Sequence, residues 1–303
     1  MLLLLACSSA PVPPPVVAPA PVLEVEAGGF QELMAFSTSV KDNDATELLK
    51  AGLASEDTSG WKLRLNHEPI APLLELSGVQ APVLAFDELG PDWSGLVDYA
   101  TYAAMRSRLL RSEGQGEQAA ELLEGALHLG LLMQYAGGGV LNEMVGIAMQ
   151  ELVLTELAEG DKYGPLGLEA EQRIRATLVE QNALPMSSPG AVYGECESLE
   201  AVLDSPELEA FLYDQEETVA VHWALCADVI TQAALPPGAR EFADPLALMD
   251  EQLGLLNPIG REVLELGGPD YRSFVDKEDA LRARRQEVIQ ALEARILAAT
   301  GPQ

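Results

Sequence analysis

Three cysteines and one histidine are the residues of this 303-residue chain whose types and spacing suggest chemistry most directly. Cys7 lies near the first residue, and Cys196 and Cys226 lie in the C-terminal half. His222 precedes Cys226 by one helical turn, a spacing at which an imidazole could activate a thiol. No third orienting residue or oxyanion motif accompanies this pair. A structural role, as a disulfide or as two buried free thiols, is therefore favoured over catalysis.

The first seven residues place a cysteine directly after a leucine run and one alanine. This stretch, Leu4-Leu5-Ala6-Cys7, resembles the lipobox of bacterial lipoproteins, in which a small residue precedes the cysteine that accepts the lipid. The resemblance implies a diacylglycerol thioether on Cys7, cleavage before Cys7, and acylation of the new amine. Residues 1–6 would then be the remnant of a signal peptide, and the lipid bilayer would be a partner through acylated Cys7.

The residues on either side of Cys7 refine this expectation. No Lys or Arg precedes Cys7, and the apolar run is shorter than the roughly seven to fifteen residues of a secretory signal. We interpret this departure as a start site assigned too far downstream; a cytoplasmic protein with an apolar tip is the alternative. In the enterobacterial sorting pattern, an Asp after the cysteine retains a lipoprotein at the inner membrane. Ser8 therefore favours the outer membrane of the cell envelope, facing the periplasm.

Residues 7–28 are predicted to be the lipidated cysteine and a disordered, proline-rich tether that precedes a domain over residues 29–303. Proline has no backbone donor and fixes φ, so the proline-rich run at 10–21 excludes helix and interior strand. In polyproline geometry, at ~3.1 Å per residue, about twenty residues reach ~60 Å. A spacer directly after a lipid anchor needs no partner, and we favour it over a ligand for a proline-recognising domain.

Lipidation of Cys7 would leave Cys196 and Cys226 as the two remaining cysteines of a chain in an oxidising compartment. We then expect a disulfide between them. It would close a loop of about thirty residues and add roughly 3–4 kcal/mol in the chain-entropy model. Two buried free thiols are the alternative.

The net charge of −30 excludes some partners. Nucleic-acid binding needs clustered Lys and Arg, and attachment to anionic lipid needs a basic surface, so neither is expected. After Cys7, no stretch reaches about 18 uncharged apolar residues, so no membrane span is predicted. The final helix carries a local basic stripe that is expected to pair with acidic neighbours, made of Arg282, Arg284, Arg285 and Arg295.

Composition and periodicity predict an all-α fold. Aromatic residues make up only 5% of the chain, so its core must consist of Leu, Val and Ala, which favours packed helices. Apolar residues at helical spacing predict three consecutive helices over residues 93–159, with breaks at 114–116 and 137–139. The third of these helices is expected to bury Leu141, Met144, Val145, Ala148, Leu152 and Leu157.

Further helices are predicted over residues 30–40, 45–54, 168–182, 205–234 and 276–299, with a loop at 184–190. The helix over 168–182 is expected to bury Ile174, Leu178 and Val179. The architecture expected for residues 29–303 is an irregular multi-helix bundle or a helical-hairpin array.

Two resemblances concern the fold alone. Gly114, Ala119, Leu123 and Ala126 are similar to the second half of a tetratricopeptide repeat, but no second copy follows at about 34 residues, so a repeat array is not expected. The same hairpin and residues 257–261 resemble exported, all-helical bacterial proteins that have no activity we can name. His128, Tyr135 and Glu143 lie around the hairpin without metal-ligand spacing, and core or groove-lining roles are expected.

No catalytic, phosphate-binding, dinucleotide-binding or zinc motif is present, so we expect no metal or cofactor and assign no catalytic residue. Our hypothesis is a lipoprotein whose helical domain is a scaffold or interaction module, with an envelope protein or peptide in a helical groove. The alternative is a helical periplasmic hydrolase that uses carboxylates for acid/base catalysis. A deep pocket with two close, strongly shifted carboxylates would favour the enzyme, and a shallow apolar groove would favour the binding module.

Overall fold

The computed structural model describes residues 16–19, 29–41, 71–76, 78–81, 92–203, 213–254, 257–267 and 271–301. Cys7, residues 1–6, most of the tether, the helix predicted over 45–54 and the predicted helix start at Ser205 lie outside these ranges. The described part is built of helices and turns without a strand, so the prediction of an all-α fold is confirmed. Within it, no helix combines the length and the apolar character that a membrane crossing requires.

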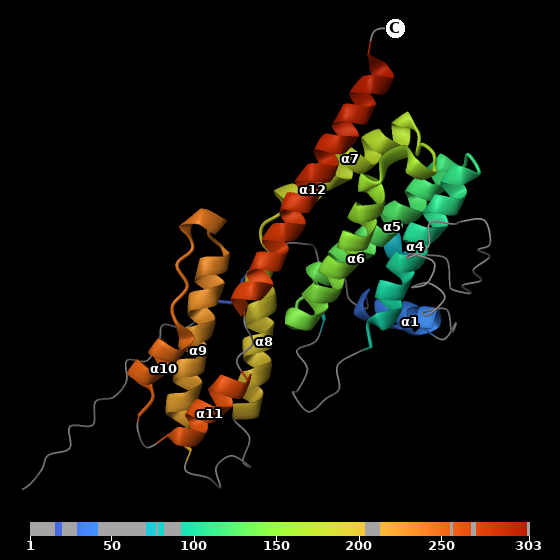
Figure 1. The fold of residues 1–303 in the computed structure, drawn as a ribbon. Coiled ribbons are helices and arrows are strands. Elements are labelled where there is room, and N and C mark those ends of the chain that lie inside the picture. The colour runs from blue at the N-terminus through green and yellow to red at the C-terminus, as the bar shows by residue number, and fades with distance from the viewer. Residues whose placement is uncertain are drawn as a thin grey trace, which may run out of the picture.

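The helices form two groups that the long final helix connects (Figure 1). The first group contains α1 (Gly29–Lys41), α3 (Ala71–Leu74), α4 (Ser94–Ser112), α5 (Gly116–Gln134), α6 (Val140–Ala158), η1 (Gly160–Tyr163) and α7 (Leu168–Ala183). The second contains α8 (Ser188–Leu203), α9 (Gln215–Ala233), η3 (Pro237–Ala239), α10 (Pro245–Gln252) and α11 (Pro258–Gly267).

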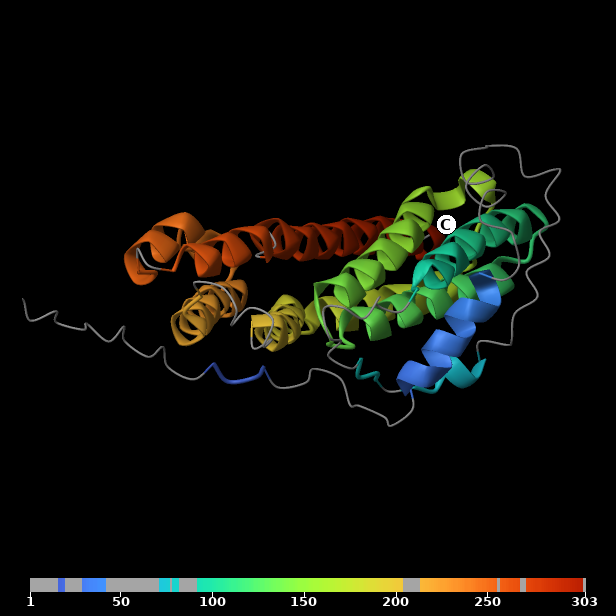
Figure 2. The same ribbon diagram turned by 90° about the horizontal axis from the view of Figure 1, so that it is seen from below.

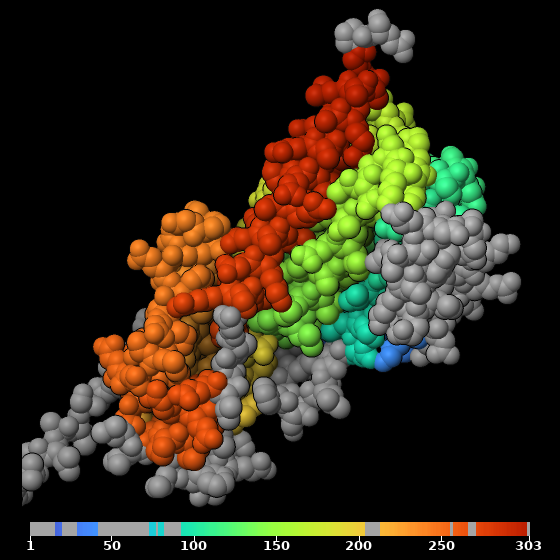
Figure 3. Space-filling view, viewed as in Figure 1, coloured from blue at the N-terminus to red at the C-terminus, as the bar shows by residue number. Residues whose placement is uncertain are grey.

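The connecting helix is α12 (Tyr271–Thr300). Figure 2 shows α12 running from the second group to the first, and the space-filling view shows it lying against both (Figure 3). A large core joins the first group to α8 and α12, and a smaller one holds the far end of the second group. The smaller core consists of Leu199, Leu203, Val221, Met249 and Leu264.

The two predicted breaks in the central helices are found where glycine permits them. Gly114 has a φ of 78° between α4 and α5, and Gly139 has a φ of 118° directly before α6. Side chains with a Cβ atom rarely adopt such angles, so glycine ends one helix and starts the next here.

Glycines also let α5 and α6 pack closely. A Cβ atom at Gly146 would lie 2.4 Å from the backbone nitrogen of Gln134 and 2.5 Å from the carbonyl oxygen of Gly130. Those contacts are with backbone atoms that cannot rotate away. The Gly146→Ala substitution is therefore expected to lower the free energy of unfolding by roughly 1–3 kcal/mol, as overpacking does.

Urea unfolding followed by circular dichroism measures this effect, and Gly190→Ala in α8 is the matched control. A Cβ atom at Gly190 would meet nothing within 4 Å. The control is expected to be neutral or to gain up to about 1 kcal/mol, because alanine restricts the unfolded chain more than glycine does. Equal effects of the two substitutions would mean that α5 and α6 are not in close backbone contact.

The predicted buried face of α6 is partly wrong. Leu141 is 57% exposed and Met144 is 37% exposed, whereas Glu143 and Gln150 are buried. The helix is rotated from the expected orientation because polar side chains of α5 and α12 meet Glu143 and Gln150 in the interior. Hydrophobic spacing alone does not contain that information.

Other predicted boundaries also need correction. The region 184–190 is not a single loop, because α8 begins at Ser188. A continuous helix from 205 to 234 is wrong, because Tyr213 and Asp214 are not helical and the side chain of Asp214 caps α9. On α7, Ile174 and Leu178 are buried as predicted but Val179 is 41% exposed.

Candidate functional site

Cys196 and Cys226 form a disulfide that joins α8 to α9, with their Cα atoms 6.4 Å apart. Both residues are fully buried, and the bond agrees with the pairing predicted from the sequence. His222 Nε2 lies 2.9 Å from the carbonyl oxygen of Cys196, and burial lowers the pKa of His222. Because the sulfur of Cys226 is already bonded, these residues are not a nucleophile with its base. Within the described ranges, Cys196, His222 and Cys226 are the one group whose side chains lie close enough together to hold a metal ion. The disulfide uses two of these three potential ligands.

A second site is a buried group of polar side chains where α5, α6, α8 and α12 meet. Ser187 Oγ lies 2.6 Å from Glu143 Oε1 and 3.0 Å from Glu278 Oε1. Gln134 Nε2 donates a hydrogen bond of 2.9 Å to Ser187 Oγ. Glu143 is 1% exposed and Glu278 is fully buried. We call Gln134, Glu143, Ser187 and Glu278 the glutamate cluster.

The two carboxyl groups have different surroundings. The backbone N–H groups of Ser187 and Ser188, at the start of α8, donate to Glu278 at 2.8 and 3.0 Å. Donors at a helix N-terminus stabilise a carboxylate anion. For Glu143, burial and the neighbouring Glu278 raise the pKa well above its usual value of 4.5, and Oε2 has no partner. The surroundings of Glu143 therefore favour its protonated form.

This asymmetry predicts a pH dependence of stability. The pKa of Glu143 is raised in the folded state, so protonation of Glu143 stabilises the fold. This contribution to the free energy of unfolding is complete below pH 4.5 and is lost as pH rises through the folded-state pKa. The Glu143→Gln variant mimics the protonated form and cannot ionise. Relative to this variant, the free energy of unfolding of the wild type is expected to fall by up to about 1.4 kcal/mol per pH unit between pH 4.5 and the folded-state pKa of Glu143.

Urea unfolding of both proteins between about pH 4 and pH 8 measures this difference. Titrating groups that do not interact with Glu143 contribute equally in the two proteins and cancel. A difference in unfolding free energy that stays constant across this range would contradict a protonated Glu143.

A chain of hydrogen bonds leads from Gln134 to Arg285. Gln150 Nε2 donates to Gln134 Oε1 at 2.9 Å, and Arg285 Nη2 donates to Gln134 Oε1 at 2.8 Å and to Gln150 Oε1 at 2.6 Å. Arg285 is fully buried, and burial lowers its pKa to about 10. The expected acidic pairing is found for Arg282 with Glu278, Arg284 with Glu287 and Arg295 with Glu171. The hydrogen bonds of Arg285 described above go to glutamines instead.

The glutamate cluster borders a surface groove of about 400 Å³. Gln134 and Ser187 line the groove, while the buried Glu143 and Glu278 are not among its lining residues. Ser187 therefore connects the groove to the two carboxyl groups. We call this site the Ser187 groove; its remaining walls include Tyr135, Ala136, Gly137, Met186, Gly190, Ala191 and Tyr193.

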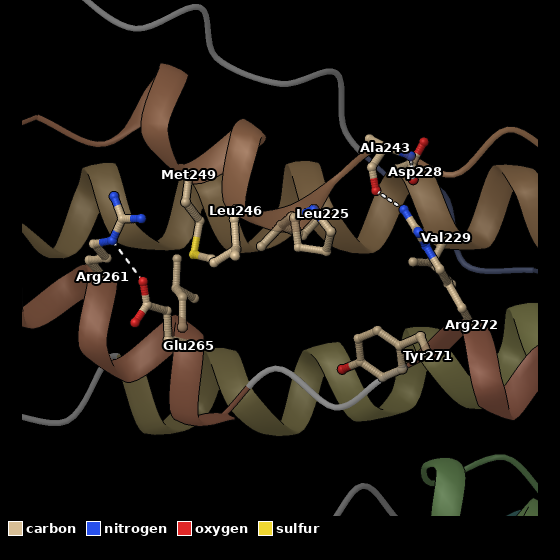
Figure 4. A pocket seen from close by; sticks show the side chains of 12 residues that line it. Leu225, Asp228, Val229, Ala243, Leu246, Met249, Arg261, Glu265, Tyr271 and Arg272 are labelled. Carbon is tan, nitrogen blue, oxygen red and sulfur yellow. Dashed lines mark hydrogen bonds and ion pairs between the residues drawn. The ribbon is translucent and has the colours of Figure 1, made fainter.

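A larger pocket of about 630 Å³ lies among α9, α10, α11 and the start of α12 (Figure 4). We call it the α9–α12 pocket. Its apolar lining includes Leu225, Val229, Leu246, Met249 and Leu264.

Charged side chains at the rim of the α9–α12 pocket are already paired. Arg261 forms ion pairs with Glu265 and Asp250, and Arg272 donates to the carbonyl oxygens of Phe242 and Ala243. The Arg261–Glu265 pair and Arg272 lie at opposite ends of the pocket (Figure 4). The free surface that the pocket offers is therefore mainly apolar.

Spacing in the sequence contained a signal for the glutamate cluster that hydrophobic periodicity does not detect. Glu143 and Gln150 lie two helical turns apart on α6, and Glu278 and Arg285 lie two turns apart on α12. Polar residues repeated at this interval on two apolar helices are typical of faces that meet through a buried polar network. Of the glutamate cluster, the sequence analysis considered only Glu143 as a site residue. It also considered Tyr135, which lines the groove as expected.

Comparisons of the chain with family models, curated proteins and solved structures give no match. The fold and the sites thus define an all-α, disulfide-bonded protein and no narrower class. The resemblance of residues 4–7 to a lipobox stays a prediction.

Proposed function

We propose that this chain is a lipid-anchored lipoprotein of the cell envelope whose helical domain is a protein-interaction module. Two independent features support export. The residues around Cys7 resemble a lipobox, and a disulfide between Cys196 and Cys226 suits an oxidising compartment. The proline-rich stretch after Cys7 fits a linker between membrane and domain.

The observation that supports an interaction module is the α9–α12 pocket. Its lining is apolar, its rim charges are paired, and Leu246 is 53% exposed. An exposed apolar pocket among helices suits an apolar side chain, or the apolar face of a helix, from a partner protein. Water leaving the lining would stabilise such a complex, and the rim would set its orientation.

A photo-reactive diazirine side chain at Leu246 tests this function in intact cells. The matched control is the same side chain at Leu297, which is 68% exposed near the end of α12 and is not part of the pocket. We expect a discrete cross-linked envelope protein from position 246 and none from position 297. Identical cross-links from both positions, or none from either, would argue against the pocket as the interaction site.

Membrane anchoring has its own test. The Cys7→Ser variant is expected to move from the membrane fraction to the soluble periplasmic fraction while its helical circular dichroism stays unchanged. Retention of this variant in the membrane fraction would contradict the proposed anchor but would not bear on the proposed role of the α9–α12 pocket.

The second candidate function is a hydrolase. The observation that favours it is the hydrogen bond from the Ser187 hydroxyl to the Glu143 carboxyl group. Ser187 lines a groove, its hydroxyl lies within hydrogen-bond distance of Glu143, and burial raises the pKa of that carboxyl group. If Ser187 is a nucleophile, a fluorophosphonate probe should form a covalent adduct on it. The adduct should disappear in Ser187→Ala and weaken in Glu143→Gln. Absence of labelling in the wild type would remove this candidate.

A further inference from the structure

The described part of the proline-rich stretch lies on the domain. Ala18 and Pro19 line the Ser187 groove together with Met186, Gly190 and Tyr193. Val16 and Pro19 are half-buried, whereas Val17 is 81% exposed and Ala18 is also exposed. Figure 2 shows residues 16–19 as a short blue trace alongside α8. Because Val16 and Pro19 are one polyproline turn apart, one side of this short segment faces the domain and the other faces solvent, with Ala18 at the open edge of the groove.

The walls of the Ser187 groove suit an extended proline-containing chain. Tyr135 and Tyr193 supply aromatic surface and Met186 an adaptable apolar side chain. Aromatic-lined grooves bind polyproline segments because these are preformed and lose little entropy on binding. Gly190 has no atom within 4 Å of the position where its Cβ would be, which leaves room for a second backbone.

We propose that the site around the Ser187 groove binds extended proline-containing peptide and that Val16–Pro19 of the same chain is its occupant, with Ala18 and Pro19 forming one wall of the volume that stays open. This inference goes beyond the α9–α12 pocket and does not require lipidation. A partner peptide of similar sequence would have to displace the chain's own segment. Because the segment belongs to the same chain, its local concentration is in the millimolar range, so displacement is expected only at about millimolar peptide.

The docked segment has one consequence that rests on the proposed anchor at Cys7. Between Cys7 and Ala18 the chain can span about 34 Å at ~3.1 Å per residue, whereas the stretch from Cys7 to Gly28 could span about 65 Å. Occupation of the groove would thus hold the domain closer to the membrane. Release of the segment would extend its reach roughly twofold.

Intramolecular cross-linking tests the occupant. A diazirine side chain is introduced at Ala18 or, as the matched control, at Val17 of the full chain carrying Cys7→Ser, so that the result is independent of lipidation. In monomeric protein we expect position 18 to cross-link to the peptide that contains Met186 to Tyr193, several-fold more than position 17. A synthetic peptide with the sequence of residues 11–23 should suppress this product at about millimolar concentration.

A variant whose side chain fills the groove provides a second test of the occupant. Gly190→Phe places a side chain in open space, so its thermal unfolding should match that of Gly190→Ala. The cross-link from position 18 should be lost in Gly190→Phe and kept in Gly190→Ala. Equal products from positions 17 and 18, persistence of the product in Gly190→Phe, or products only between two chains would each overturn the proposal.

Discussion

Replacing both Cys196 and Cys226 by alanine is expected to lower the free energy of unfolding by roughly 3–4 kcal/mol. The disulfide closes a loop with a sequence separation of 30, and its loss gives the unfolded chain more conformations. Because the bond ties α8 to α9 inside the large core, its removal also weakens the packing of α9 on α8.

Urea unfolding of oxidised protein, with and without reductant, measures this effect. The wild type should lose stability on reduction, while the Cys196→Ala/Cys226→Ala variant should not respond. Cys7→Ala is the control and should behave like the wild type. Indistinguishable unfolding of oxidised and reduced wild type would show that the bond does not constrain the domain.

The Glu278→Ala substitution is expected to cost roughly 3–5 kcal/mol, the range for removing one partner of a buried charged pair or network. It removes the acceptor for the backbone N–H groups of Ser187 and Ser188 and for Gln134 Nε2, at a position without access to water. Buried donors without acceptors and the cavity left by the side chain both destabilise the folded state.

Glu287 on the same helix provides the matched control. Its side chain is 65% exposed and pairs with Arg284, so Glu287→Ala should change stability by no more than about 0.5 kcal/mol. Glu278→Gln should be intermediate, because the amide keeps one acceptor oxygen but places an NH₂ group beside a backbone donor. A Glu278→Ala variant as stable as Glu287→Ala would mean that the glutamate cluster does not organise the start of α8.

The parts of the fold that the sequence predicted depend on local signals. The breaks before α5 and α6 follow from glycines whose backbone angles only glycine readily adopts. Helix α7 matched within a residue because Gly167 and Pro185 limit it. The orientation of α6 was not predicted, because its buried Glu143 and Gln150 are stabilised by Ser187, directly before α8, and by Arg285 on α12, which lie far away in sequence.

The candidate sites likewise divide into one that the sequence suggested and one that depends on contacts between segments far apart in the chain. Counting cysteines, with Cys7 set aside as lipidated and an oxidising compartment assumed, suggested the Cys196–Cys226 bond. The Ser187 groove could not be predicted, because residues from the tether, the α5–α6 turn and the start of α8 form it only in the folded chain. Ser187 itself lies within a stretch interpreted as a loop, where a single serine has no distinguishing pattern.

The mass of the intact, non-reduced protein extracted from its native membranes tests the central claim most directly. We predict a chain that begins at Cys7, is heavier by a diacylglycerol and an acyl group, and is lighter by the two protons lost when Cys196 and Cys226 pair. An unmodified chain that retains Met1 and carries free thiols would contradict both the lipid anchor and export to an oxidising compartment.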